Sequence, residues 1–169
     1  EILGRKQLHE TFHFLKKYIP GFENCKLAYS GPNIGIRESR KINGVYKLTV
    51  DDLTNNVMFP DAVTMGGYPI DVHSPDGNNT VHKFLKPGSW YSIPYRSLVT
   101  NEIENLIVAG RCISFDEGLN YDAREVGTCF VTGQAAGVAS ALAANLRSSV
   151  QEVNIGKLQE SLRKQNVYL

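Results

Sequence analysis

The most specific short motif lies near the start of the sequence, where His9, Glu10 and His13 form the pattern H-E-x-x-H. On a helix, two histidines one turn apart can bind zinc, and the glutamate can act on a metal-bound water. No H-x-x-G-x-x-H extension follows, so a third ligand would have to come from His73, His82 or a distant acid. We therefore favour a solvated helix face here and expect no metal site, with a zinc-dependent hydrolase as the alternative.

A second group of polar residues suits substrate binding or proton transfer. Arg37 lies in the charged segment 35–40, and an arginine can hold a carboxylate or a flavin carbonyl, although a surface ion pair fits the same spacing. Tyr68 and His73 lie near a predicted strand, where Asp71 shares a face with His73 and can orient the imidazole. We take Arg37, Tyr68 and His73 as the catalytic candidates.

A third group marks a strand, a loop and a helix. The run from Asn105 to Gly110 is almost wholly apolar and ends in glycine, which is typical of a buried strand of a parallel sheet. A helix is predicted to begin near Gly127 and Thr128, and the N–H groups of a helix start attract anions or polarised oxygens. We take Gly110, Arg111, Gly127 and Thr128 as cofactor-binding candidates, with a plain strand–loop–helix unit as the alternative.

Several common motifs are missing from the chain. No G-x-G-x-x-G occurs, so the sequence has no dinucleotide-binding fingerprint. No Walker loop, no G-x-S-x-G turn and no C-x-x-C pair occurs either. The sequence therefore gives no support to an ordinary hydrolase with a nucleophile and a base.

Helices are predicted at the start and at the end of the chain. Four apolar residues recur with helical spacing and predict a helix over about 3–18: Leu8, Phe12, Leu15 and Ile19. The segment 128–146 is dense in glycine and alanine and predicts a long helix that approaches its neighbours closely. A short terminal helix is predicted around residues 155–162.

The middle of the chain predicts short strands and turns. Strands are expected over 26–29, within 34–45, over 68–72 and over 90–99, with turns at Asn43-Gly44 and over 74–79. Thr49 and Asp52 have the spacing of a helix N-cap.

Composition narrows the class of protein. The chain has 169 residues, 42% hydrophobic and 21% charged, with a formal net charge of +1, so we expect a globular fold and no nucleic-acid partner. Three cysteines and no C-x-x-C pair argue against a disulfide framework and favour the cytoplasm, although a cleaved signal peptide would leave no trace. We expect no apolar run of membrane-spanning length. Because the sequence opens with Glu1 and a helical pattern, we expect it to be cut from a longer chain.

Five sequence blocks occur in one order and together resemble the C-terminal half of a bacterial family of FAD-dependent oxidoreductases. The blocks are Gly35-Ile-Arg-Glu-Ser-Arg40, Gly67-Tyr-Pro-Ile-Asp-Val-His73, Trp90-Tyr-Ser-Ile-Pro-Tyr-Arg96, Asn105-Leu-Ile-Val-Ala-Gly-Arg-Cys-Ile-Ser114 and Thr132-Gly-Gln-Ala-Ala-Gly137. The similarity runs from the first helix to the last. It implies a flavoprotein with two dinucleotide folds, whose N-terminal Rossmann segment grips the ADP half of FAD and is absent here.

The resemblance also implies a role for the last third of the chain. The segment 106–109 and the helix from Thr128 would return to complete the FAD-binding domain. Gly110, Arg111, Gly127 and Thr128 would then lie against the ribityl chain, the pyrophosphate and the flavin O2 edge. Many relatives have Gly-Asp at the end of this strand, whereas this chain has Gly110-Arg111. The family does not fix the small-molecule substrate.

We therefore expect an α/β fold, or α+β as an isolated fragment, that forms the C-terminal portion of a Rossmann-like flavoprotein. Residues 1–100 would form the substrate side with mixed short strands, and residues 101–169 the returning strand–helix unit and terminal helix. The expected activity is hydride or electron transfer between FAD and a small substrate. We expect the fragment alone to be inactive and to lack FAD, and a non-catalytic binding module is a further alternative.

Overall fold

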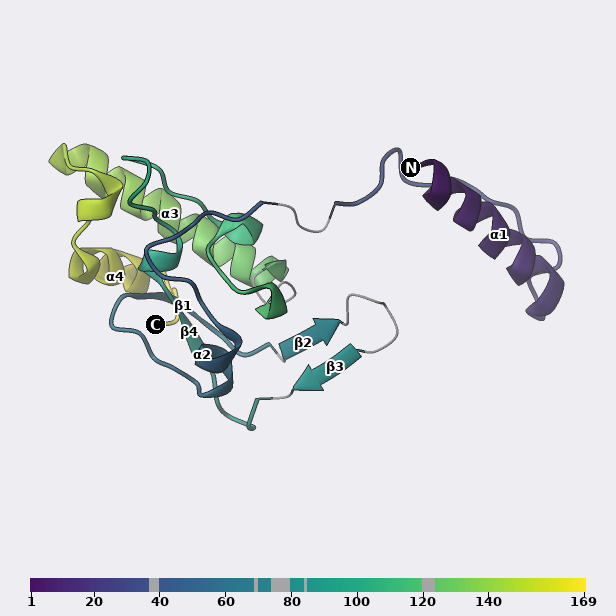
Figure 1. The fold of residues 1–169 in the computed structure, drawn as a ribbon, viewed down its shortest axis with the longest axis horizontal. Coiled ribbons are helices and arrows are strands. Elements are labelled where there is room, and N and C mark those ends of the chain that lie inside the picture. The colour runs from purple at the N-terminus through teal and green to yellow at the C-terminus, as the bar shows by residue number, and fades with distance from the viewer. Residues whose placement is uncertain (37–39, 69, 74–79, 84, 120–123) are drawn as a thin grey trace. The chain divides into compact units, whose positions relative to one another are not determined.

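A computed structural model of the chain describes all residues except 37–39, 69, 74–79, 84 and 120–123 (Figure 1). The chain divides into two compact units, Glu1–Arg37 and Glu38–Leu169. The proposed division at residue 100 into a substrate side and a cofactor side concerns function, and it stays a prediction.

The first unit consists of one helix and an extended segment. Helix α1 spans Ile2–Tyr18 and confirms the predicted helix. Its half-buried positions are the four apolar residues of the predicted stripe: Leu8, Phe12, Leu15 and Ile19. The predicted strand over 26–29 is wrong: among the described residues no strand pairs with this segment, and Tyr29 is 88% exposed.

The second unit contains two small antiparallel sheets. Strand β1 (Ala62–Gly66) pairs with β4 (Tyr91–Pro94), and β2 (Ile70–His73) pairs with β3 (Thr80–Lys83). The strand predicted over 90–99 is therefore confirmed in its first half. After Pro94 the chain turns into a 3₁₀ helix, η1 (Tyr95–Ser97), since proline cannot continue the ladder of hydrogen bonds. The predicted turn at 74–79 lies outside the described residues.

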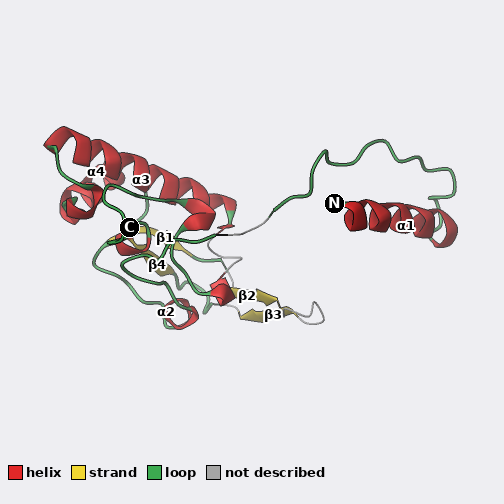
Figure 2. Ribbon diagram, turned by 45° about the horizontal axis from the view of Figure 1, so that its top comes forward, coloured by secondary structure: helices red, strands yellow, loops and turns green. Residues whose placement is uncertain are grey.

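Helices α3 and α4 pack against the β1–β4 pair. Helix α3 (Val126–Leu146) contacts β1, and α4 (Ile155–Lys164) contacts both α3 and β1. Both views show α3 running alongside this sheet (Figures 1 and 2). The short helix α2 (Val50–Thr54) begins with the capping box that Thr49 and Asp52 predict. These three helices confirm the predicted helix starts to within a few residues.

The core lies between α3, α4 and the β1–β4 sheet. On α3, the buried positions are Thr132, Ala135, Ala139 and Ala143. Because these side chains are small, the helix backbone can approach the sheet closely, as the sequence predicts. Larger buried side chains fill the space around them: Leu53, Tyr91, Ile93, Leu98, Ile113, Leu119, Leu158 and Leu162.

Two predictions for the second unit are wrong. The segment 105–110 forms no strand of a parallel sheet; it makes one isolated antiparallel bridge between Ile107 and Val99, because the described residues offer no parallel neighbour. Asn43-Gly44 forms no hairpin either. The N–H of Ile42 instead donates to the Cys112 carbonyl, which aligns this segment with the 3₁₀ helix η2 (Gly110–Cys112). The observed class is a small mixed α/β fold.

Helix α3 also corrects the expectation about apolar segments. Among the described residues it is long and apolar enough, by length and composition alone, to cross a bilayer. The core helix of a soluble protein passes the same test, so this is weak evidence. That the chain has no membrane partner stays a prediction.

Tyr95 connects the sheet to the segment after α3 and should make stability depend on pH. Its hydroxyl is buried and donates to the Val150 carbonyl at 2.7 Å. Burial raises the pKa of Tyr95 to about 12. The folded pKa lies above the ordinary value of about 10. The protonated Tyr95 hydroxyl therefore contributes its full share to the free energy of unfolding below pH ~10, and that share is lost as the pH rises towards ~12.

We therefore expect Tyr95→Phe to flatten the alkaline fall in unfolding free energy between these two pH values. The measurement is urea unfolding across that range. An unchanged pH slope in Tyr95→Phe would show that this hydroxyl does not ionise with unfolding.

Candidate functional site

Gly110 lies at the centre of the predicted cofactor junction, where the segment after β4 turns into η2. Its φ of +65° lies in the left-handed region, and the residue is buried. Its N–H donates to the hydroxyl of Thr132 at 3.0 Å, and that hydroxyl donates to the Thr128 carbonyl at 2.7 Å. The start of α3 is thus tied to Gly110 through one buried threonine, which the sequence analysis did not single out.

Cys129, in the first turn of α3, is the residue nearest to the Cβ position of Gly110. Its sulfur would lie 3.3 Å from a Cβ added at Gly110, so a larger residue there would crowd the Cys129 side chain. Burial raises the pKa of the Cys129 thiol, against a smaller opposite effect of Arg111. The thiol is therefore protonated at neutral pH, which does not suit a nucleophile. Its role at this position is packing.

The first turn of α3 carries the other two predicted cofactor residues. Glu125 precedes the helix without any side-chain capping bond. Gly127 is exposed, with no atom within 4 Å of an added Cβ, and Thr128 is half-buried. The structure therefore brings Gly110 and Thr128 together through Thr132, while Gly127 faces open space and Arg111 is exposed. An uncapped helix start beside open space suits a polarised oxygen or an anion.

The three catalytic candidates are not assembled into one described cluster. Arg37 lies outside the described residues. Tyr68 is 44% exposed just before β2, and His73 is the last residue of β2. The backbone of β2 contacts η3 (Glu117–Leu119), which belongs to the loop between Gly110 and α3. The strand carrying His73 therefore lies beside the predicted cofactor loop.

The H-E-x-x-H residues lie on α1 away from its half-buried stripe. His9, Glu10 and His13 are all exposed, and Glu10 pairs with Lys6 at 3.8 Å. Among the described residues, no group of three or more His, Cys, Asp or Glu side chains could hold a metal ion.

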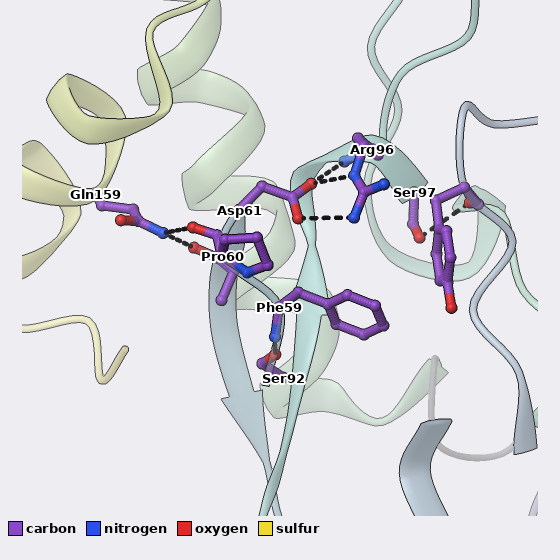
Figure 3. Close-up of polar contacts among 9 residues, drawn as sticks. Phe59, Pro60, Asp61, Ser92, Arg96, Ser97 and Gln159 are labelled. Atoms are coloured by element: carbon purple, nitrogen blue, oxygen red, sulfur yellow. Dashed lines mark hydrogen bonds and ion pairs between the residues drawn. The ribbon is translucent and has the colours of Figure 1, made fainter. Parts of the chain in front are cut away.

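An ion pair with several hydrogen bonds joins Asp61 and Arg96 in the second unit, and the sequence analysis did not single it out. Asp61 accepts from Nε of Arg96 at 2.9 Å, from Nη2 at 3.2 Å and from the Arg96 backbone N–H at 3.1 Å (Figure 3). The side chain of Asp61 is 10% exposed and that of Arg96 is 43% exposed. Local spacing could not reveal this pair, because Asp61 comes just before β1 and Arg96 lies in η1, 35 residues further along the chain.

Comparison with known proteins decides the family. The model of a family described as FAD dependent oxidoreductase matches residues 1–162. The chain belongs to this FAD-dependent oxidoreductase family. No match was found among curated proteins or among solved structures.

Membership confirms the family that the five sequence blocks predict. The members of this family are oxidoreductases that depend on FAD. The match therefore identifies the cofactor of the family and shows that the chain belongs to a family of enzymes. The match covers both compact units, since it begins at residue 1 and ends in α4. The substrate, the site residues and cofactor binding by this chain are matters for proposal.

Proposed function

We propose that this chain is the C-terminal part of a flavin-dependent oxidoreductase that transfers hydride or electrons between FAD and a small substrate. In this proposal an N-terminal Rossmann segment of the same protein holds the ADP half of FAD. The segment from Gly110 to α3 completes that domain. The observation that carries the proposal is the Gly110–Thr132–Thr128 junction beside the uncapped start of α3.

The surface of α3 supports a missing neighbour. The helix is apolar on every side, yet Val126, Phe130 and Leu146 are 65%, 75% and 57% exposed. A helix that is apolar all round is normally covered all round. An N-terminal segment of the same protein is the occupant we propose for this face. The family depends on FAD, and the two-stranded sheets of the described residues do not form a dinucleotide-binding fold.

The residues at the junction fit one edge of a flavin. Gly110, Arg111, Gly127 and Thr128 would hold the cofactor: the glycines leave space, and the helix start offers N–H groups. When bound, FAD supplies the hydride or electron acceptor. The partial positive charge of the helix start would favour negative charge developing at that edge, and so would Arg111, which acts electrostatically on Cys129 in the first turn of α3.

The substrate side is proposed to be the β2–β3 hairpin with its flanking residues. The contact of β2 with η3 supports this, because it places the His73 strand beside the cofactor loop. Arg37, Tyr68 and His73 are the proposed groups for orienting the substrate and moving a proton. The exposure of Tyr68 leaves its hydroxyl accessible to a ligand.

We expect the 169-residue chain to purify without stoichiometric flavin. The chain contains no G-x-G-x-x-G fingerprint, so we expect it to lack most of the affinity for FAD. The same chain extended by its natural upstream sequence should be yellow, with a visible flavin band, and FAD should be released on denaturation.

The measurement is a visible absorption spectrum of both proteins at equal concentration. A stoichiometric band in the 169-residue chain would overturn the need for an upstream segment. A colourless extended protein that stays colourless after addition of FAD would overturn the proposed function.

A further inference from the structure

A cavity of about 220 Å³ lies against the Asp61–Arg96 pair, apart from the cofactor junction. Its apolar wall is formed by Val45, Val99, Val153 and Ile155. Residue 153 follows η5 (Val150–Glu152), and η5 comes after the C-terminal end of α3. Because α3 is 21 residues long, that end lies roughly 30 Å from the Gly127 end.

The guanidinium of Arg96 is fixed in place at this cavity. Asp61 holds its Nε and Nη2 atoms (Figure 3). The guanidinium carbon also lies 5.1 Å from the centre of the Tyr46 ring. Tyr46 is itself held, since its hydroxyl donates to both carboxylate oxygens of Asp52 at 2.9 Å. The arginine is thus preorganised by side chains from three segments.

One edge of this guanidinium has no protein partner within the described part of the chain. Asp61 takes the Nε side, and no hydrogen bond uses Nη1. The planar fork of arginine matches a carboxylate through two parallel N–H donors. The side chain of Gln151, which also lines the cavity, is already committed to the carbonyls of Thr100 and Ile103.

We propose that this cavity is a second binding site, which takes a small aliphatic monocarboxylate. The carboxylate meets the Nη1 edge of Arg96, and the hydrocarbon part lies against the valine and isoleucine side chains. The volume is below the roughly 300–1,000 Å³ typical of drug-sized ligands, so the ligand is small. Asp61 already balances the single positive charge of Arg96, so binding is weak and depends on both the free N–H donors of the guanidinium and the apolar wall.

The test is an NMR titration of the 169-residue chain with sodium isovalerate and, separately, with its neutral amide. Isovalerate should give saturable shifts at Arg96, Val153 and Ile155, and the amide should bind about tenfold more weakly, because charge-assisted hydrogen bonds are stronger than neutral ones. Arg96→Lys keeps a positive charge beside Asp61 but loses the paired N–H donors of the guanidinium. We expect this variant to bind isovalerate about tenfold more weakly.

Ile155→Phe narrows the cavity without touching the ion pair and should also weaken isovalerate binding about tenfold. Val126→Phe, at an exposed position of α3, is the matched control and should bind normally. Circular dichroism checks that each variant is folded. Equal affinity for acid and amide, or normal binding by folded Ile155→Phe, would overturn the proposal, as would no saturable binding by the unmodified chain. None of these outcomes bears on flavin binding.

Discussion

Gly110→Ala should lower the free energy of unfolding by about 2–3 kcal/mol. A left-handed φ costs an L-residue roughly 1–2 kcal/mol, and Gly110 has a φ of +65°. The new Cβ would also lie 3.3 Å from the sulfur and 3.6 Å from the Cβ of Cys129. Gly110 is the buried first residue of η2 and faces Cys129 of α3. Crowding of the Cys129 side chain therefore adds to the backbone strain.

Gly88→Ala separates these two effects. Gly88 has a φ of +77°, but an added Cβ there meets no atom within 4 Å. Gly88→Ala should therefore show only the cost of the left-handed backbone, about 1–2 kcal/mol. Combining Gly110→Ala with Cys129→Ala removes the crowded sulfur, so the double variant should lose less than the two single losses added together.

Urea unfolding followed by circular dichroism gives all four values. If Gly110→Ala is no more destabilising than Gly88→Ala, the close approach of η2 and α3 is not as tight as the geometry indicates. The Gly110–Thr132–Thr128 junction would then not be a rigid support for a cofactor.

The helices could be predicted from the sequence because their signals are local. The stripe of α1 and the capping box of Thr49 and Asp52 depend on residues within a few positions of one another. For α3, the small residues indicated both a helix and its close packing. These are properties that a single segment determines by itself.

The strands were harder because a strand depends on its neighbour. The apolar run from Asn105 to Gly110 has the composition of a buried parallel strand, yet it makes only the bridge between Ile107 and Val99. Likewise, Asn43-Gly44 has the residues of a tight hairpin, but the segment aligns with η2 through Ile42 and Cys112. Pairing across such distances leaves no trace in local spacing.

In the candidate site, too, local features could be predicted from the sequence and contacts between distant residues could not. Gly110 and the start of α3 could be found from the sequence, since glycine and helix-start signals are local. Thr132 could have been noticed only by placing it on the buried face of α3 with Ala135 and Ala139. The Asp61–Arg96 pair joins residues far apart in the chain, so only the structure reveals it.

Gly127→Val should weaken FAD binding by the longer protein about tenfold or more. Gly127 is the second residue of α3, exposed, with open space around its Cβ position. In the proposed function this space is occupied by the flavin edge that faces the helix start. A branched side chain would push the ring away from the N–H groups, and a loss of about 1.4 kcal/mol is a tenfold change in affinity.

Gly156→Val is the matched control, because Gly156 is the second residue of α4 and is also exposed. Both variants place a β-branched residue in the first turn of a helix. Only Gly127 belongs to the proposed cofactor junction, so Gly156→Val should keep its flavin even if it loses some stability at the Asn154 cap.

The most direct test of the central claim is the FAD content per chain of the longer protein, measured for the unmodified form, Gly127→Val and Gly156→Val. We predict a full flavin complement in the unmodified form and in Gly156→Val, and a large loss in Gly127→Val that rises again when excess FAD is added. Full flavin content in Gly127→Val, with the affinity of the unmodified protein, would contradict the placement of FAD at the start of α3.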